Sequence, residues 1–235
     1  MGRADSLARA ALLTRPPVAY IHRFLAADGW HDYELTYDQL ERNTAWTARQ
    51  LTAHGLQQGH RALLTFAGVE GPWVRPIADA LRQLRVMYGT AEAAGWDHSR
   101  ARYLNRQLAP RAVIGLSLQT AEALAEQGPL GELFARTALV LARPDAVSLL
   151  RSAGVDAAAL DLVGPALGIE CQERAGVHVD AGAWVLAERD GQPVISGAPG
   201  GPAVDPVPLP VTARVVMDIC GCGSTDPRLV RERAG

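Results

Sequence analysis

The sequence predicts an α/β fold in which a largely parallel sheet, flanked by helices, is followed by a smaller β-rich region. Two observations predict it. Between residues 34 and 163, short apolar runs of strand length alternate with segments of helical periodicity, a pattern typical of βαβ units. Near Gly164 the helical periods end, and short strand-like segments occupy residues 164–235. The chain has 235 residues, 48% of them hydrophobic, so it is long enough to bury a sizeable core.

Residues 1–33 are expected to form an irregular N-terminal arm. Pro16-Pro17 interrupts any early helix, and Asp28-Gly29 is typical of a turn. The N-terminus lacks the hydrophobic core of a signal peptide, and no run approaches the roughly 18 apolar residues of a membrane helix. We therefore expect a cytoplasmic protein without a membrane partner.

Residues 34–163 form the predicted α/β region. Thr36 is a suitable N-cap for a helix from Tyr37 to about Thr52, and Gly55 is suited to end it. Apolar runs predict the strands that follow, over residues 62–66, 86–88, 112–115 and 139–141. Apolar residues at helical spacing predict helices between these strands, starting near Pro72 and over residues 99–108, 120–126 and 146–151. Alternation of this kind favours a parallel sheet.

Residues 164–235 form the predicted β-rich region. Strand-like segments occupy residues 177–179, 183–188, 193–195 and 211–217. Asp190-Gly191 is typical of a hairpin turn between two of them. The stretch from Gly197 to Pro210 is dense in Gly and Pro and predicts a loop.

Lysine does not occur in the sequence, and all 23 Lys+Arg residues are arginines. A Schiff base, a pyridoxal-phosphate anchor, a Walker-A lysine and a lysine general base are therefore excluded from this chain. The formal net charge is -2 and the arginines are scattered, which argues against a nucleic-acid partner. We interpret the arginine-bearing segment over residues 100–111 as a solvated helix face.

The chemistry-bearing residues of the β-rich region are its cysteines and one histidine. All three cysteines of the chain lie there, as Cys171, Cys220 and Cys222, and His178 follows the first of them after six residues. Three thiolates and an imidazole form a ligand set that zinc prefers, and four protein ligands leave no open position, so the ion would be structural. The alternative is a set of inert buried cysteines and a packed histidine.

Two segments carry a resemblance to a known family. Residues 170–179 read ECQERAGVHV, and residues 220–228 read CGCGSTDPR. Together they resemble segments of the phenylacetate-CoA ligase branch of the adenylate-forming superfamily, some members of which bind zinc through these residues. Residues 35–40, 55–61 and 108–115 resemble earlier landmarks of its large N-terminal domain, in the correct order. The resemblance covers roughly residues 34 to 230 and favours the zinc interpretation.

The sequence departs from this family at the nucleotide site. The family has a Ser/Thr/Gly-rich phosphate loop before the position of Leu35, where this chain has residues 22–33 with Gly29 as their only glycine. A Tyr-Gly-x-Thr-Glu segment of the family corresponds here to residues 163–167, VGPAL. Residues 88–92, YGTAE, are similar to that segment but come too early in the chain.

Asp218 stands where the family has the aspartate that binds the ribose of the nucleotide, although a structural role beside the cysteines is an equal alternative. We expect the C-terminal domain of the family, with its adenylation lysine, to be absent. Without the phosphate loop, the magnesium-binding glutamate and the lysine, three electrostatic supports of adenylation are missing.

The resemblance implies that the protein binds an aryl or acyl small molecule of a biosynthetic pathway, free or bound to a carrier protein. We expect no ATP-dependent adenylation, and hypothesise an ATP-independent acyl condensation, cyclisation or transfer. The candidate acid/base groups are His98, Tyr88 and Glu92, each with a surface or packing role as the alternative.

Two other hypotheses belong to different classes. One is a non-catalytic binding or partner protein for a carrier protein or a companion ligase. The other is a nucleotide sensor that uses Asp218. The resemblance also implies a homodimer.

Overall fold

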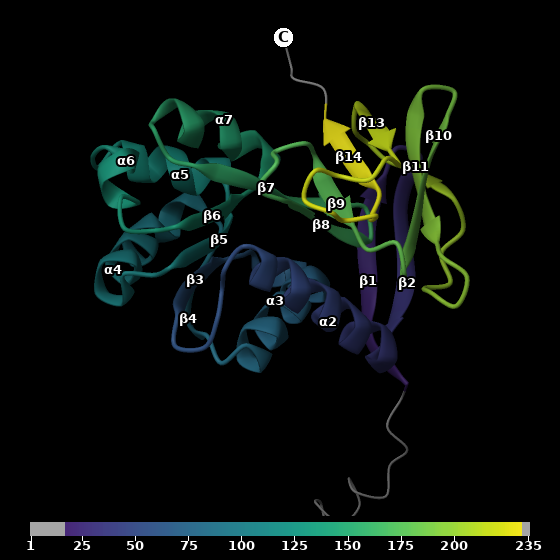
Figure 1. Ribbon diagram of the computed structural model, residues 1–235, viewed down its shortest axis with the longest axis horizontal. Coiled ribbons are helices and arrows are strands. Elements are labelled where there is room, and N and C mark those ends of the chain that lie inside the picture. Colours follow the sequence, from purple (N-terminus) through teal and green to yellow (C-terminus); the bar gives the residue numbers. More distant parts are fainter. Residues whose placement is uncertain (1–16, 232–235) are drawn as a thin grey trace, which may run out of the picture.

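The computed structural model describes residues 17–231, and its central feature is a nine-stranded mixed sheet (Figure 1). The strand order is β13-β14-β9-β8-β7-β6-β5-β3-β4. The strands from β7 to β4 in this order run parallel, and the others are antiparallel. Two smaller antiparallel sheets, β1-β2 and β10-β11-β12, pack against the antiparallel half. The predicted α/β fold with a following β-rich region is therefore confirmed.

The parallel half contains the predicted alternation of strands and helices. Its strands are β3 (Arg61–Thr65), β4 (Met87–Ala91), β5 (Ala112–Leu116), β6 (Leu139–Ala142) and β7 (Ala157–Val163). Its helices are α2 (Tyr37–Ala53), α3 (Gly71–Gln83), α4 (His98–Leu108), α5 (Leu118–Ala125), α6 (Leu130–Leu133) and α7 (Pro144–Ser152), with short 3-10 turns η1 (Gly68–Glu70) and η2 (Gly95–Asp97). Sequence reasoning missed β7 and the single turn α6.

Both faces of the parallel half are covered by helices. Leu64 and Ile114 pack in one core cluster with side chains of α2 and α3. Their chain neighbours Leu63 and Val113 pack in a second cluster with α5 and α7. Successive strand residues point to opposite faces, so a strand covered on both sides reads as a continuous apolar run. This is the pattern from which these strands were predicted.

The sheet continues without interruption into the β-rich region. Chain reversal at Gly164-Pro165 pairs β7 with β8 (Ala166–Glu170), and β9 (Val177–Val179), β14 (Arg228–Arg231) and β13 (Ala213–Val216) follow across the sheet. The boundary expected near Gly164 thus falls in a tight hairpin turn. Strands β8 and β14 were not predicted, because each is a short segment without clear alternation.

The smaller sheet of the β-rich region contains β10 (Trp184–Arg189), β11 (Gln192–Gly197) and β12 (Val207–Pro208). The predicted hairpin turn is present, since Asp190 and Gly191 connect β10 to β11 with φ values of 51° and 75°. Strand β12 lies inside the stretch that was predicted to be a loop.

The irregular arm predicted for residues 1–33 is wrong over residues 18–33. These residues form β1 (Val18–Ala26) and most of β2 (Gly29–Thr36), an antiparallel hairpin whose turn contains Asp28-Gly29. Buried and exposed residues alternate along β1, but three exposed apolar side chains hide this period in the sequence: Ile21, Leu25 and, on β2, Trp30. Residues 1–16 lie outside the described residues.

No helix within residues 17–231 is long and apolar enough to cross a membrane.

Candidate metal centre and ligand cavity

Four side chains converge where β8 and β9 meet the loop between β13 and β14. Cys171 directly follows β8, His178 is the middle residue of β9, and the loop contributes Cys220 and Cys222. Their ligand atoms all lie within 4.8 Å of one another. Three of the four residues are buried, and Cys222 is exposed. The structure therefore brings together all four residues that the sequence marked as metal ligands.

The separations within this Cys/His cluster fit four ligands around one metal ion. The Sγ atoms of Cys171 and Cys220 lie 3.7 Å apart, and Cys222 Sγ lies 3.6 Å from His178 Nε2. Tetrahedral coordination at metal–sulfur distances of about 2.3 Å and metal–nitrogen distances of about 2.0 Å places two sulfurs about 3.8 Å apart and sulfur and nitrogen about 3.5 Å apart. A disulfide needs about 2.05 Å, so the thiols are unpaired. The cluster could hold a metal ion.

His178 is oriented as a ligand by its other ring nitrogen. Its Nδ1 donates to the backbone oxygen of Asp226 at 3.3 Å, which leaves the Nε2 lone pair directed at the cluster. The Asp226 carboxylate accepts hydrogen bonds from Trp46 Nε1 at 2.9 Å and from the backbone N–H of Ala181 at 3.1 Å. The loop that carries two cysteines is thereby tied to helix α2.

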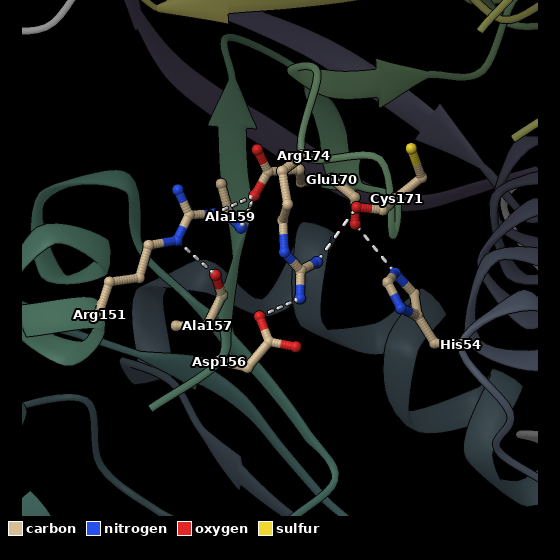
Figure 2. A network of polar contacts seen from close by, with 8 residues as sticks. All are labelled: His54, Arg151, Asp156, Ala157, Ala159, Glu170, Cys171 and Arg174. Carbon is tan, nitrogen blue, oxygen red and sulfur yellow. Dashed lines mark hydrogen bonds and ion pairs between the residues drawn. The ribbon is translucent and has the colours of Figure 1, made fainter. Parts of the chain in front are cut away.

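Cys171 is positioned by a polar network around the end of β8 (Figure 2). The buried carboxylate of Glu170 accepts a hydrogen bond from Arg151 Nη2 at 3.0 Å and another from the backbone N–H of Ala159 at 2.9 Å. Arg151 also donates from Nε to the Ala157 oxygen at 2.9 Å. These contacts bind helix α7 and strand β7 to the residue that precedes Cys171.

The same network holds the backbone of Cys171 itself. Arg174 donates from Nη1 to the Cys171 oxygen at 3.1 Å and from Nη2 to Asp156 Oδ1 at 2.7 Å. His54 Nε2 donates to the backbone oxygen of Glu170, the residue before Cys171, at 2.9 Å. Figure 2 shows the Cys171 sulfur pointing away from these contacts. This sulfur is one of the four ligand atoms of the Cys/His cluster.

The cluster is electrostatically suited to a cation. Burial raises the pKa of the Cys171 thiol to about 12, because desolvation disfavours the charged thiolate. A bound metal ion compensates that charge and binds the deprotonated sulfur.

An apolar cavity of about 580 Å³ is lined by none of the four residues of the Cys/His cluster. It is an open cavity lined by residues of the β1-β2 hairpin, the start of α3, the β7-β8 turn and the segment before β13. Its apolar lining includes Phe24, Leu25, Trp30, Trp73, Leu209 and Val211.

A second pocket, of about 490 Å³, adjoins this apolar cavity at the carboxyl ends of the parallel strands, and we call it the polar pocket because five charged side chains contribute to its mixed lining. Glu70, Leu162 and Arg231 line both. In the polar pocket Arg143 forms an ion pair with Glu70 at 2.7 Å, and Arg231 donates two hydrogen bonds to the buried carboxylate of Asp161, at 2.6 and 2.8 Å.

Arg143 has hydrogen-bonding capacity to spare. Its Nη1 is buried and finds no partner among residues 17–231, while its guanidinium stacks over the Phe66 ring at 5.2 Å. A guanidinium held in this way can donate to a carbonyl or carboxylate oxygen.

The predicted acid/base residues do not gather at this site. Tyr88 lies on the edge strand β4 beneath the Arg82 guanidinium, 5.7 Å from the ring centre. Glu92 lines a separate pocket of about 210 Å³ that includes neither Tyr88 nor His98. Both ring nitrogens of His98 have neighbours, since Nδ1 donates to the Gly95 oxygen at 2.6 Å and Nε2 lies 3.2 Å from the Ser99 hydroxyl.

Asp218 is exposed in the segment that leads from β13 to Cys220. Its backbone oxygen accepts a hydrogen bond from Arg228 Nη2 at 3.3 Å, and Arg228 Nη1 donates to the Ala175 oxygen at 3.2 Å. Asp218 thus belongs to the loop that carries the two last cysteines.

Sequence reasoning missed the residues of the polar pocket. Arg143 had a usable signal, since it follows the predicted strand over residues 139–141 and so stands at the carboxyl end of a parallel strand, where ligands bind in α/β sheets. The pairing of Arg231 with Asp161 joins residues 70 positions apart and had no signal in the sequence.

Comparisons with known proteins show what this fold is. No family model matches the sequence, and no curated protein matches it either. Solved structures do match. A 2-hydroxyisobutyryl-CoA ligase in the postadenylation state, in complex with R3-HIB-AMP, has a TM-score of 0.69 at 14% identity, over 97% of this chain and 56% of that chain. The same ligase in an open conformation with 2-HIB-AMP and CoA has a TM-score of 0.66 at 14% identity, over 97% and 57%.

An ATP-bound RpMatB-BxBclM chimera has a TM-score of 0.55 at 12% identity, over 79% of this chain and 41% of that chain. The chain thus spans a little over half the length of the 2-hydroxyisobutyryl-CoA ligase chains. The fold of this chain is similar to part of the fold of these adenylate-forming acyl-CoA ligases, and the matches do not single out the phenylacetate-CoA ligase branch.

Proposed function

We propose that this protein binds an aryl or acyl intermediate of a biosynthetic pathway in the apolar cavity, as a ligase-like protein related to the phenylacetate-CoA ligase branch. The observation that carries the proposal is the junction of an apolar cavity with an arginine that has an unpartnered donor, at the carboxyl edge of a parallel sheet. Parallel α/β sheets bind their ligands at this edge.

The two adjoining pockets divide the ligand into two parts. The ring or acyl chain occupies the apolar cavity, whose aromatic and aliphatic walls favour apolar surface. The carboxylate or thioester carbonyl lies toward the polar pocket, where Arg143 Nη1 donates a hydrogen bond. Arg231 lines both pockets and stays paired with Asp161.

Binding occurs without adenylation. Residues 163–167, where the resembling family has its nucleotide- and metal-binding segment, form a tight β7-β8 hairpin of apolar residues. Residues 22–33, where it has its phosphate loop, belong to a β hairpin with a single glycine. The backbone amides of paired strands donate within the hairpin, so they do not form a phosphate cradle.

An ATP-independent acyl condensation, cyclisation or transfer is the chemistry this site suits if the protein is an enzyme. Its alternative is a non-catalytic partner of a carrier protein or companion ligase. One observation favours the alternative: the cavity is bordered by strongly exposed apolar side chains, with Trp30 67% and Val69 87% exposed. Such side chains suit contact with a protein that presents the ligand.

The Cys/His cluster holds structural zinc in this proposal. Three thiolates and one imidazole are a donor set that zinc prefers, and the separations between them suit tetrahedral coordination. With four protein ligands the ion fastens the β13-β14 loop to β8 and β9.

A binding experiment tests the proposed ligand site. Phenylacetate, benzoate and their coenzyme A thioesters are titrated into the wild type and into Val211→Trp by calorimetry. Val211 lines the cavity, so the larger side chain fills it, whereas Val185→Trp on the exposed face of β10 is the matched control. We expect the wild type and the control to bind one of these probes and Val211→Trp to lose at least tenfold in affinity. Equal affinities in all three proteins, or no binding of any probe, would contradict the proposal.

A further inference from the structure

Three arginine side chains line a pocket at the amino ends of the parallel strands, the opposite edge of the sheet from the polar pocket. Arg102 and Arg106 lie on α4, and Arg136 follows α6 (Figure 1). The pocket has a volume of about 310 Å³ and includes Pro110, just before β5, and Thr137, just before β6. It shares no residue with the apolar cavity or the polar pocket. We call it the arginine pocket.

The positive charge of the arginine pocket is not balanced from within. Its lining contains three guanidinium groups and a single carboxylate, that of Glu132. No carboxylate in the described part of the chain lies within ion-pair distance of any of the three arginines. In the polar pocket, by contrast, Arg143 pairs with Glu70 and Arg231 with Asp161. The arginine pocket is therefore a concave positive site on a chain of formal net charge -2, and such a site attracts anions.

Arg102 is positioned by hydrogen bonds that leave most of its donors free. Its Nη1 donates to the backbone oxygen of Gln127 at 2.8 Å and to Gln127 Oε1 at 3.0 Å. The Gln127 amide is itself held, because its nitrogen donates to Nε2 of His98. These bonds leave Nη2 and Nε of Arg102 for another partner. A guanidinium that is positioned beforehand loses less side-chain entropy when it binds an anion.

The two helices of the pocket are joined by a buried contact. Asn105 of α4 lines the pocket and is 6% exposed, and its Nδ2 donates to the backbone oxygen of Leu133 in α6 at 2.8 Å. In the turn before α6, Gly128 has a φ of 143°, and a Cβ atom there would lie 3.9 Å from Arg102 Nη2. The fold thus sets the separation between the arginines of α4 and the segment that carries Arg136.

We propose that the arginine pocket binds a phosphate group, as inorganic phosphate or as part of a small organic phosphate ester. Its volume lies at the lower end of the range for small-molecule sites, about 300–1,000 Å³. Arg106 and Arg136 are exposed, so an anion reaches them directly from solvent. The inference does not depend on the proposed function, because the two sites share no residue.

A phosphate suits this pocket better than a carboxylate does. Each guanidinium can donate two parallel hydrogen bonds to one anion, so three of them need about six acceptor positions. A carboxylate offers about four such positions on two oxygens. A phosphate monoester has three terminal oxygens and a charge of about -1.5 to -2 at pH 7, which also matches the unbalanced charge of the pocket. The hydroxyl of Thr137 supplies a further donor.

Calorimetry at low ionic strength tests the site with inorganic phosphate, glycerol 3-phosphate and acetate. The probes are titrated into the wild type and into Arg106→Gln/Arg136→Gln. The matched control is Arg189→Gln/Arg214→Gln, which removes two exposed arginines from β10 and β13 and so changes the net charge equally. Loss of one hydrogen bond to a charged group corresponds to about tenfold or more in affinity. We expect a phosphate probe to bind the wild type and the control alike, and to bind Arg106→Gln/Arg136→Gln at least about tenfold more weakly.

A second measurement locates the anion without any variant. In ¹⁵N-labelled wild type, the backbone amide signals of Gly128 and Thr137 should shift when phosphate is added, because both residues line the pocket. The signal of Gly191, in the turn between β10 and β11, should stay in place.

The probes also identify the source of the phosphate group. Tighter binding of glycerol 3-phosphate than of phosphate indicates an organic ester, and the reverse order indicates the free ion; both results support the site. The inference is refuted if neither phosphate probe binds, if acetate binds as tightly as they do, or if Arg106→Gln/Arg136→Gln keeps the affinity of its control. None of these probes carries an aryl group or a long acyl chain, so this inference and the proposed function fail separately.

Discussion

Acidification should destabilise the protein through His22, and replacing that residue should remove the effect. Burial lowers the pKa of His22 to about 4, whereas a histidine in the unfolded chain titrates near 6.5. The folded protein therefore keeps the imidazole neutral at pH values where the unfolded chain already binds a proton. Its contribution to stability is complete above about pH 6.5 and is lost as the pH falls toward 4.

The size of this loss follows from the difference between the two pKa values. It amounts to about 2 kcal/mol at pH 5 and about 3 kcal/mol at pH 4. The assay is urea denaturation followed by far-UV circular dichroism at pH 7, 6, 5 and 4, on the wild type and on His22→Phe. The difference between their free energies of unfolding should shift in favour of His22→Phe by these amounts as the pH falls.

Tyr33→Phe is the matched control for this measurement. This variant removes the hydroxyl of a buried side chain that packs against His22. A tyrosine in the unfolded chain already titrates above the pH range used, and burial raises the pKa of Tyr33 further. The difference between Tyr33→Phe and the wild type should therefore stay constant from pH 7 to 4. A constant difference for His22→Phe as well would refute the claim that His22 is buried and neutral.

The other predictions concern the Cys/His cluster, the polar network around Glu170 and the absence of adenylation. Metal analysis of the purified protein should find about one zinc per chain, and Cys220→Ser should reduce this content sharply and lower the unfolding temperature; a metal-free and equally stable wild type would contradict the zinc proposal. Glu170→Gln should cost about 1–3 kcal/mol in urea denaturation, because it weakens a buried contact with Arg151, whereas Asp156→Asn should cost less than about 1 kcal/mol because its carboxylate is exposed. ATP–pyrophosphate exchange with the aryl acids should be absent, and clear exchange would overturn the argument from the β7-β8 hairpin.

The sequence predicted those parts of the fold whose signals are local. Thr36 caps α2 as expected, and its hydroxyl accepts from the Gln39 N–H at 3.3 Å while the Gln39 side chain accepts from the Thr36 N–H at 2.9 Å. This reciprocal pair needs only residues three apart. The Cys/His cluster was predictable for another reason: the chain has three cysteines, and all of them lie in one region with a suitable histidine.

The parts that sequence reasoning missed depend on partners far away in the chain. The β1-β2 hairpin carries exposed Ile21 and Trp30, so its period of two is visible only when the buried face is known. Arg231 acquires its partner Asp161 through the register of the sheet. His22 is buried in part by Trp73 from α3, whose ring packs edge to face against it although the two residues are far apart in the chain.

The claim that the cavity binds a ligand is tested most directly by the indole signals of the five tryptophans. Trp30 and Trp73 line the cavity, whereas Trp46 binds Asp226 near the Cys/His cluster and Trp96 is exposed on the helical side. In a titration of ¹⁵N-labelled protein with 4-hydroxyphenylacetate, assigned by single Trp→Phe variants, we predict that the signals of Trp30 and Trp73 shift and those of Trp46 and Trp96 stay in place. Shifts at Trp46 or Trp96 alone, or no shift at saturating ligand, would contradict the claim.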